Sequence, residues 1–234
     1  MAGNGTTNWK FVLGSVAVIL VVAGLALFSY GVVTSSIKES TRNELRSVAG
    51  VMATQVNAID IYQLKPGDEL SPSYDALLNS LHVMRSMDDR ITNVYILHVS
   101  DDQVITFVAD DLFIEDPLGS AKIGDVYISP DKQEIFGALS LPMASQSPYT
   151  DKWGTFISGY APIDDSINGS SGNTTAVLGV DMSASVYAIR VREAGVNMLI
   201  AAIVSMLILV GVMYGVTRRT EVPPDESKGT WEKD

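Results

Sequence analysis

The two histidines are the first residues to test for chemistry, because a near-neutral imidazole serves both proton transfer and metal binding. His82 lies in a stretch with helical periodicity and His98 in a β-rich stretch. Neither has a second ligand at a zinc-binding spacing or a Ser and Asp in the pattern of a catalytic triad. The sequence also contains no G-x-S-x-G motif and no phosphate-binding P-loop. We therefore do not expect an enzyme.

Three pairs of acidic residues have the right atoms for a divalent cation, because Ca²⁺ and Mg²⁺ prefer carboxylate oxygens. The pairs are Asp101-Asp102, Asp110-Asp111 and Glu115-Asp116. Their spacing matches no EF-hand loop, and Asp pairs are ordinary turn residues. Cysteine is absent, which excludes thiolate chemistry and disulfides. A cation site is therefore the less favoured alternative, and we expect no bound metal and no cofactor.

The negative charge is concentrated in the middle of the chain. Residues 34–194 contain 22 acidic and 11 basic side chains, and the net charge of the whole 234-residue chain is −11. Binding to nucleic acid requires a basic surface that neutralises phosphates. We therefore expect no nucleic-acid partner.

Two uncharged apolar segments enclose this acidic region, at residues 11–37 and 194–217. Each is long enough to cross a hydrocarbon core, which takes roughly 20 helical residues. A cleaved signal peptide is the alternative for the first segment, but its apolar run is too long and no small-x-small cleavage site follows. We predict transmembrane helices at residues 11–33 and 194–217, and hence a membrane protein.

The orientation follows from the basic residues that flank the two spans. Lys10 precedes the first span and Arg218-Arg219 follows the second, which favours both termini on the cytoplasmic side. Five basic residues on the domain side favour the opposite, but long domains translocate largely regardless of such charges. We therefore expect a two-pass plasma-membrane protein with residues 34–193 outside the cytoplasm. Residues 1–10 and 218–234 would be cytoplasmic, the latter as a short disordered tail.

Helical periodicity continues after the first span. Apolar residues recur at three- and four-residue steps, at Leu45, Val48, Met52, Val56 and Ile59. We predict one long helix that ends at the breaker Pro66-Gly67. A second helix is predicted over residues 74–87, with Ser73 as its N-cap. Its expected apolar face is Leu77, Leu78, Leu81 and Met84.

The pattern then changes to the two-residue period of strands. Strands are predicted at residues 91–100, 103–110, 154–163 and 175–183. The first two flank the turn Asp101-Asp102 and should form a hairpin. Residues 134–139 fit a short helix or a strand edge, and residues 184–193 a helix that leads into the second span. The predicted fold is an α+β domain with an antiparallel sheet.

Two of these stretches resemble a known family. Residues 94–110, VYILHVSDDQVITFVAD, and residues 153–183, which contain Gly159-Tyr160, Pro162-Ile163 and Gly179-Val180-Asp181, are similar to the single Cache (PAS-like, PDC-type) domains. These domains lie outside the cytoplasm in prokaryotic sensor kinases and chemoreceptors. The resemblance covers nearly all of residues 34–193.

The resemblance implies a PAS-like sheet of about five strands with the long N-terminal helix behind it. It also implies a pocket for a small ligand on the other face, under loops that can close. The family's ligands are amino acids, carboxylates, amines and purine-like molecules. Its Gly-Val-Asp aspartate often holds an amino group, a role that falls to Asp181 here and suits a charge-assisted hydrogen bond. The alternative is that Asp181 caps the following helix, in competition with Ser183.

Aromatic residues are the other candidates for the ligand pocket. Those that can line its wall are Tyr95, Phe107, Tyr149, Trp153 and Tyr160, although each also fits ordinary core packing. Family members that bind amino acids usually supply an Arg for the ligand's carboxylate. Arg90 is the only Arg between Arg85 and Arg190, and we expect it to be solvated. The class of ligand therefore stays open.

Two functions remain from these observations. The first is a sensor module that binds a small solute and passes a conformational signal through its two membrane helices. Because only residues 218–234 follow the second span, its output is expected from a partner, unless the chain is the sensory part of a longer or degenerate receptor. The expected partner is a signalling protein or a second copy of the chain in a homodimer. The alternative is a membrane interaction subunit that keeps the Cache fold but binds no ligand.

Overall fold

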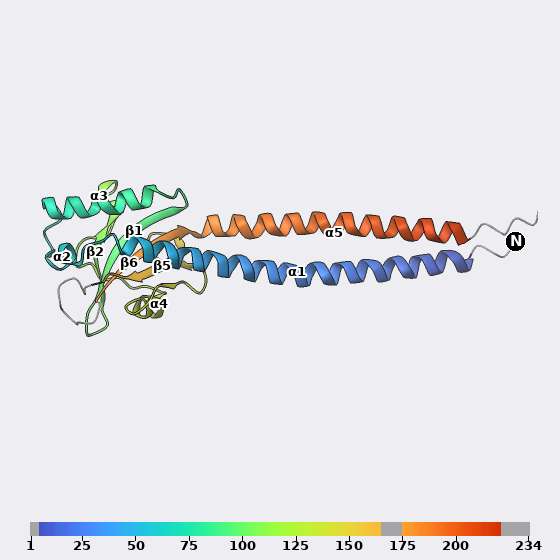
Figure 1. The fold of residues 1–234 in the computed structure, drawn as a ribbon, viewed down its shortest axis with the longest axis horizontal. Helices are drawn as coiled ribbons and strands as arrows, with labels where there is room; N and C mark the ends of the chain where they lie inside the picture. The colour runs from blue at the N-terminus through green and yellow to red at the C-terminus, as the bar shows by residue number, and fades with distance from the viewer. Residues whose placement is uncertain (1–4, 165–174, 221–234) are drawn as a thin grey trace, which may run out of the picture. The chain divides into compact units, whose positions relative to one another are not determined.

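The computed structural model describes residues 5–164 and 175–220 as an α+β protein with one antiparallel sheet (Figure 1). The helices are α1 (Gly5–Ala53), α2 (Ala58–Tyr62), α3 (Pro72–Ser86), the 3-10 helix η1 (Asp111–Ile114), α4 (Lys132–Gly137) and α5 (Ala184–Thr220). The strands are β1 (Ile91–Val99), β2 (Ile105–Asp110), β3 (Met143–Ala144), β4 (Tyr149–Thr150), β5 (Thr155–Pro162) and β6 (Ala176–Ser183). The α+β class and the antiparallel sheet predicted from the sequence are confirmed.

The chain divides into two compact units, each of which includes part of α1 and part of α5. The helix-pair unit comprises residues 1–35 and 192–234, and the sheet unit comprises residues 36–191. Both long helices include stretches apolar enough to cross a membrane, within Phe11–Ala53 and Ala184–Val216. Helix α5 continues to Thr220, which includes the first three residues of the predicted tail. The remainder of that tail, residues 221–234, lies outside the described residues.

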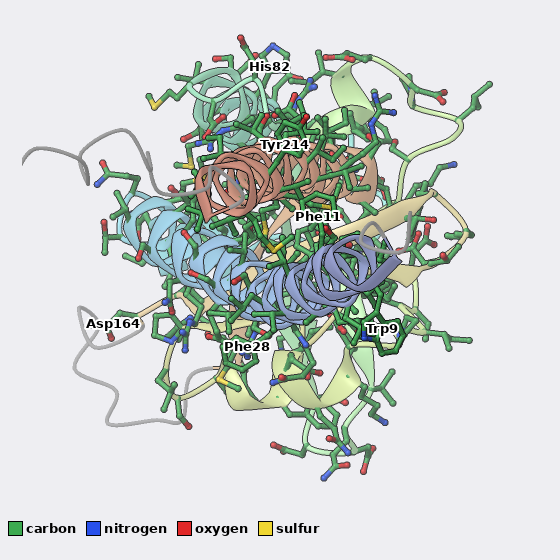
Figure 2. All side chains as sticks on the ribbon, turned by 90° about the vertical axis from the view of Figure 1, so that its right-hand side faces the viewer. Trp9, Phe11, Phe28, His82, Asp164 and Tyr214 are labelled. Atoms are coloured by element: carbon green, nitrogen blue, oxygen red, sulfur yellow. The ribbon has the colours of Figure 1, made fainter. Side chains whose placement is uncertain are left out.

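Within the helix-pair unit the two helices run antiparallel. The rings of Phe11 and Tyr214 meet edge to face with centroids 6.0 Å apart. Figure 2 labels both residues in a view along the two helices. One turn away, a Cβ added to Gly14 would lie 2.9 Å from Sδ of Met213. Small residues allow such close approach between membrane helices. Gly14 and, at the other end of the pair, Gly195 beside the Tyr30 ring are the glycines at which the two helices come this close.

The sheet unit has the strand order β2-β1-β6-β5-β3, and β4 also pairs with β5. The predicted hairpin is present, since β1 and β2 are antiparallel neighbours. The loop between β5 and β6 lies mostly outside the described residues. Consecutive strands β1 and β2 form one half of the sheet and β3 to β5 the other, with β6 between them.

The two faces of the sheet carry different residues because side chains alternate along each strand. On one face Val94, Ile96 and Val180 pack with Leu45 of α1 and Leu78 of α3. The opposite face holds a second cluster under α4, which includes the buried aromatic residues Tyr95, Phe107, Tyr127 and Tyr160. We call these the helix face and the aromatic face.

Gly159 allows α1 to lie directly on the sheet. A Cβ added to Gly159 would be 2.4 Å from the carbonyl oxygen of Leu45, so a side chain here would force α1 or β5 to shift. The glycine of the GY-x-PI strand is therefore explained by helix packing on the helix face.

Two predicted helix boundaries are wrong. The N-terminal helix does not continue to Pro66, because α1 ends at Ala53 and α2 begins separately after Asn57, whose side chain accepts a hydrogen bond from the Ile59 N–H. The N-cap of α3 is Ser71 rather than Ser73, because Pro72 occupies the first turn, where its missing N–H costs nothing. The predicted apolar face of α3 is confirmed as buried.

Candidate functional site

Two rows of side chains cross the aromatic face on neighbouring strands. In the first row Asp181 of β6 lies between Asn93 of β1 and Ser158 of β5. In the second row Gly179 of β6 lies between Tyr95 of β1 and Tyr160 of β5. Directly opposed residues in a sheet have neighbouring side chains. The Gly-Val-Asp sequence thus places the carboxyl group of Asp181 next to the space that Gly179 leaves by having no side chain.

The gap at Gly179 is filled by the ring of Tyr95. A Cβ at Gly179 would lie 2.3 Å from Cε2 of that ring. In this position the Tyr95 hydroxyl donates a 2.9 Å hydrogen bond to Oδ1 of Asp181, and the Ser158 hydroxyl donates one of 2.6 Å to the same oxygen. Asp181 therefore faces the sheet's aromatic side and does not cap α5. Ser183 instead accepts a hydrogen bond from the Ser185 N–H.

A β-bulge brings a second carboxyl group to this face. The pairing of β1 with β2 shifts between Ile96 and Leu97, which face Ala109 and Phe107 respectively, so Val108 is an extra residue. A bulge of this kind re-aims the side chains that follow it. Phe107 and Asp110 consequently both reach the aromatic face, although they are three residues apart.

Hydrogen bonds from the backbone hold the Asp110 side chain. Its Oδ1 accepts from the Leu112 N–H at 3.1 Å and its Oδ2 from the Ala121 N–H at 3.1 Å. The loop after β2 is thereby tied to the end of the strand.

A third carboxyl group comes from the turn between β4 and β5. Oδ1 of Asp151 accepts hydrogen bonds from the N–H groups of Trp153 and Gly154, and its Oδ2 accepts one of 3.0 Å from the Tyr127 hydroxyl. The indole N–H of Trp153 donates to the Gly119 carbonyl at 2.9 Å. This last bond joins the turn to the loop after β2.

These groups surround a small cavity of about 10 Å³. This is room for about one water molecule. Its lining consists of Asn93, Tyr95, Phe107, Asp110, Tyr127, Asp151, Trp153, Phe156 and Asp181. The cavity therefore combines three carboxyl groups with five aromatic rings, and no lining residue is basic.

The electrostatics of the cavity are dominated by Asp181, which is only 4% exposed. Burial raises its pKa to about 7, even though the hydrogen bonds from Ser158 and Tyr95 favour the charged form. The charges of Asp151 and Asp110 raise it further. Burial likewise raises the pKa of Asp110 to about 6. An unpaired negative charge is thus costly here, and a cation would lower that cost.

A chain of hydroxyl groups extends from Asp181 to a further buried acid. The Tyr149 hydroxyl lies 2.8 Å from the Ser158 hydroxyl and 3.2 Å from that of Tyr160. Tyr160 donates to Oδ2 of Asp131 at 3.3 Å, whose pKa burial raises to about 6. This series of hydrogen bonds therefore connects the cavity with the start of α4.

The structure divides the predicted site residues into two groups. Tyr95, Phe107, Trp153 and Asp181 line one cavity. Tyr149 and Tyr160 lie behind it in the hydroxyl chain. Both are buried. Arg90 takes no part, because it pairs with Asp88 and Glu44.

Five lining residues were missed by the sequence analysis. They are Asn93, Asp110, Tyr127, Phe156 and Asp151. Asn93 and Phe156 lie in predicted strands and share the faces of Tyr95 and Ser158 by simple alternation, which was a usable signal. Asp110 reaches the aromatic face only because of the bulge at Val108. Tyr127 and Asp151 lie outside the predicted strands, so alternation does not apply to them.

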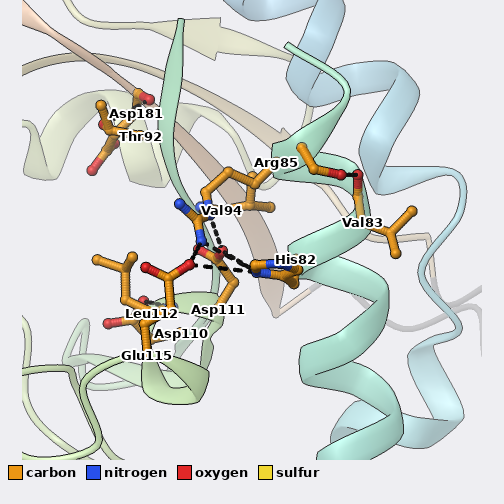
Figure 3. A network of polar contacts seen from close by, with 11 residues as sticks. His82, Val83, Arg85, Thr92, Val94, Asp110, Asp111, Leu112, Glu115 and Asp181 are labelled. Atoms are coloured by element: carbon orange, nitrogen blue, oxygen red, sulfur yellow. Dashed lines mark hydrogen bonds and ion pairs between the residues drawn. The ribbon is translucent and has the colours of Figure 1, made fainter. Parts of the chain in front are cut away.

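A separate polar cluster lies on the other side of the Asp110-Asp111 pair (Figure 3). Asp111 is fully buried and accepts hydrogen bonds from the Val94 N–H at 2.9 Å and from Nε of Arg85. Arg85 of α3 also pairs with Glu115, and its Nη2 lies 3.2 Å from Nδ1 of His82. His82 is thus part of an ion-pair cluster that fastens α3 to the end of β2.

No protein-family model matches the chain, and no curated protein sequence matches it. Among solved structures, the periplasmic domain of RsbU from Chlamydia trachomatis is similar with a TM-score of 0.33 and 16% sequence identity. The match covers 70% of this chain and 58% of that chain.

Proposed function

We propose that this protein is a membrane-anchored sensor module, and that its sheet unit is a PAS-like Cache domain outside the cytoplasm. The domain binds a small solute that carries a positively charged nitrogen. The signal passes along α1 and α5 to a partner in or near the membrane. The observation that carries the proposal is the buried carboxyl group of Asp181, which faces an aromatic-walled cavity with no basic residue in its lining.

The composition of the cavity favours a cation. Carboxyl groups form charge-assisted hydrogen bonds with ammonium groups, and aromatic faces attract cations. One cation–π contact is already present beside the cavity. Nζ of Lys152, which does not line the cavity, lies 4.0 Å from the centroid of the Trp153 ring. That side chain shows that this indole accepts a cation on one of its faces.

The same composition argues against carboxylate and amino-acid ligands. A ligand carboxylate would need Arg, Lys or backbone donors in place of the three acids that line the cavity. Bringing a further negative charge beside Asp181 would add repulsion in a poorly solvated site. Amines are therefore the favoured class among those that the family resemblance implies.

The route for a signal is supported by the continuity of the chain. Asp181 lies in β6, and β6 is followed without a loop by α5. On the helix face, α1 contacts β5 at Gly159. Shifts of about 1–2 Å in such elements are sufficient in known signalling transitions. A ligand that prefers one of two positions of β6 would bias both helices.

Thermal unfolding of the full chain in lipid nanodiscs tests which class of solute binds to the protein. We expect millimolar amines to raise the melting temperature, while acetate, glycine and adenine leave it unchanged. Asp181→Asn should abolish the amine effect, and Asp102→Asn, in an exposed turn, should not. Stabilisation by the carboxylate alone, or equal stabilisation of the Asp181→Asn variant, would contradict the proposal.

The orientation is tested by labelling, because the chain contains no cysteine. A cysteine in place of Asp102 should react with a membrane-impermeant maleimide in intact cells. A cysteine placed in the 218–234 tail should react only after permeabilisation. The reverse pattern would place the sheet unit in the cytoplasm.

A membrane interaction subunit without a ligand is the second candidate. The small volume of the cavity favours it, since aromatic side chains fill most of the space that a solute would need. In that case no solute raises the melting temperature, and Asp181→Asn stabilises the protein by removing a buried acid. Co-purification with one membrane partner, unaffected by any amine, would support this candidate.

A further inference from the structure

The hydroxyl chain between Asp181 and Asp131 consists of Ser158, Tyr149 and Tyr160, in that order. Its four contacts measure 2.6 Å, 2.8 Å, 3.2 Å and 3.3 Å, from the Asp181 end to the Asp131 end. All five side chains are buried. Because buried polar groups need hydrogen-bond partners, each of the four contacts should contain one proton.

The number of protons in this chain depends on the charge of its two acids. Each hydroxyl group has one proton to donate. With both acids ionised, the three hydroxyl protons serve four contacts, so one contact has two acceptor oxygens and no proton. With one acid protonated, four protons fill four contacts, all in one direction. With both acids protonated on the oxygens that face the chain, two hydrogens would meet in one contact. The chain is therefore complete with one added proton.

Neighbouring hydroxyl groups do not change this count, because each brings its own proton and has its own acceptor. Tyr95 and Ser145 donate to the acids at the two ends. The Tyr127 hydroxyl lies 3.4 Å from that of Tyr149, but it donates to Asp151 at 3.0 Å. None of these three groups supplies the missing proton.

The surroundings of the two acids favour uptake of this proton. Burial raises the pKa of Asp181 to about 7 and that of Asp131 to about 6. The negative charges of Asp151 and Asp110 add to this at Asp181, and that of Glu134 adds to it at Asp131. The two ends of the chain therefore compete for a proton in the same pH range.

No basic side chain neutralises either acid by an ion pair within the part of the chain that the structure describes. Lys132 follows Asp131 directly, but its Nζ lies over the Phe136 ring, 5.1 Å from the centroid. Burial also raises the pKa of Tyr149 and Tyr160, so these hydroxyls keep their protons. The negative charge therefore lies on the two acids.

We propose that Asp181 and Asp131 hold one proton between them, and that the hydroxyl chain passes it from one acid to the other. In this transfer the proton of Asp181 moves to Ser158, each hydroxyl passes its own proton on, and Tyr160 gives its proton to Asp131. Four O–H bonds break and four form, and the negative charge moves from Asp131 to Asp181. The inference goes beyond the proposed function, because it requires no solute.

The Asp131 end of the chain is connected to α1. The Ser145 hydroxyl donates to Oδ2 of Asp131, and the Ser145 carbonyl accepts a 3.1 Å hydrogen bond from Nε of Arg42 on α1. Hydrogen bonds to ionised groups are stronger than those to neutral ones, so Ser145 is held more firmly when Asp131 is charged. The position of the proton therefore affects a residue to which α1 is attached.

Carbon NMR of the full chain in nanodiscs, with ¹³C in the aspartate carboxyl groups, tests the inference by titration from pH 4 to pH 9. Asp181→Asn and Asp131→Asn assign the two resonances. In the unmodified chain we expect both resonances to shift over the same pH range, because the proton is distributed over both acids.

Tyr149→Phe removes one hydroxyl and leaves every charge in place. The chain then separates into two parts, each with one contact and one proton, so an added proton completes nothing. We expect the upper titration step to move down by about one pH unit, which is about tenfold weaker binding of the proton. Burial and charge repulsion alone predict the opposite, since loss of a buried hydroxyl raises a carboxyl pKa or leaves it unchanged. Tyr62→Phe, the same change at a tyrosine that is 39% exposed, should have no effect.

Two results would overturn the shared proton. One is an upper step that stays or rises in Tyr149→Phe, and the other is a titration of the unmodified chain in which the two resonances shift in separate pH ranges. Neither result bears on the proposed function, because no solute is present. If Tyr149→Phe does not fold, the two resonances of the unmodified chain decide the question.

Discussion

Tyr95 and Gly179 are opposed residues on β1 and β6, and the Tyr95 ring occupies the space where a Gly179 side chain would lie. From that position its hydroxyl reaches Asp181 two residues further along β6. The aspartate and the glycine of the Gly-Val-Asp sequence therefore act as one unit. The aspartate supplies the carboxyl group. The glycine leaves room for the Tyr95 ring, whose hydroxyl donates a hydrogen bond to that carboxyl group.

Gly179→Ala should impair the site by displacing Tyr95. The new Cβ would lie 2.3 Å from the ring, so the 2.9 Å hydrogen bond to Asp181 cannot persist. We expect a loss of about 1–3 kcal/mol in stability and weaker binding of amines. Gly159→Ala is the matched control, because its Cβ meets the Leu45 carbonyl on the helix face. It should lower the melting temperature while the folded protein keeps its affinity. Equal affinities of the two variants would contradict this account.

Stability should fall as the pH rises from about 4 to 7. Burial raises the pKa of Asp181 to about 7 from an ordinary value of 3.8. Between these values the folded state binds more protons than the unfolded state, so the free energy of unfolding decreases with pH. Asp181→Asn should flatten the dependence of the melting temperature on pH. Asp102→Asn serves as the comparison and should leave the slope as it is.

The affinity for amines should show the opposite trend with pH. The cation favours the ionised form of Asp181, so affinity should increase from pH 6 to pH 8 and binding should release protons. Calorimetry in buffers of different ionisation enthalpy measures this release. Binding that is independent of pH would mean that Asp181 is already charged without the ligand.

The ion pair of Arg85 with Asp111 should be important for stability. Asp111 is fully buried, and Arg85→Leu would leave its charge without a cation. We expect a loss of about 3 kcal/mol in the free energy of unfolding. Arg90→Leu removes an arginine that is 42% exposed and paired at the surface, and should cost less than about 1 kcal/mol. Urea titration of both variants measures the difference, and similar costs would refute it.

The antiparallel packing of the apolar segments can be tested by cross-linking. Gly14→Cys with Met213→Cys should form an intramolecular disulfide on oxidation, because the two positions are in contact. Gly24→Cys with Met213→Cys should not, because a Cβ at Gly24 meets nothing within 4 Å. Gel mobility under non-reducing conditions distinguishes the products. A disulfide in the second pair alone would rule out this register.

Some elements were predictable from the sequence because a single periodicity specifies them. The β1–β2 hairpin, the apolar face of α3 and the two apolar helices all follow from local patterns of two or 3.6 residues. Asp181 was identified because a resemblance directed attention to Gly-Val-Asp, and Tyr95 because aromatic residues can line a ligand pocket. Their mutual hydrogen bond depends on cross-strand register, which no local pattern specifies.

The rest of the site depends on interactions between segments distant in the sequence. Tyr127 reaches the cavity because the segment around it pairs with β2, where the Tyr127 N–H bonds to the Ile105 carbonyl. Asp151 is positioned by its own turn, through hydrogen bonds to Trp153 and Gly154. The end of α1 at Ala53 was missed because apolar spacing continued through the break, at Val56 and Ile59. Periodicity alone does not reveal such an interruption.

The extra residue Val108 has a consequence for recognising related chains. In a regular strand, Phe-x-Asp would put the aromatic ring and the acid on one face, whereas this chain needs Phe-x-x-Asp. A related chain without the bulge would therefore form the same cavity wall with one residue fewer between the aromatic ring and the acid. An ungapped alignment of such a pair would match Asp110 with a residue on the opposite face of the sheet. The shared acid becomes visible only when a one-residue gap is placed at Val108.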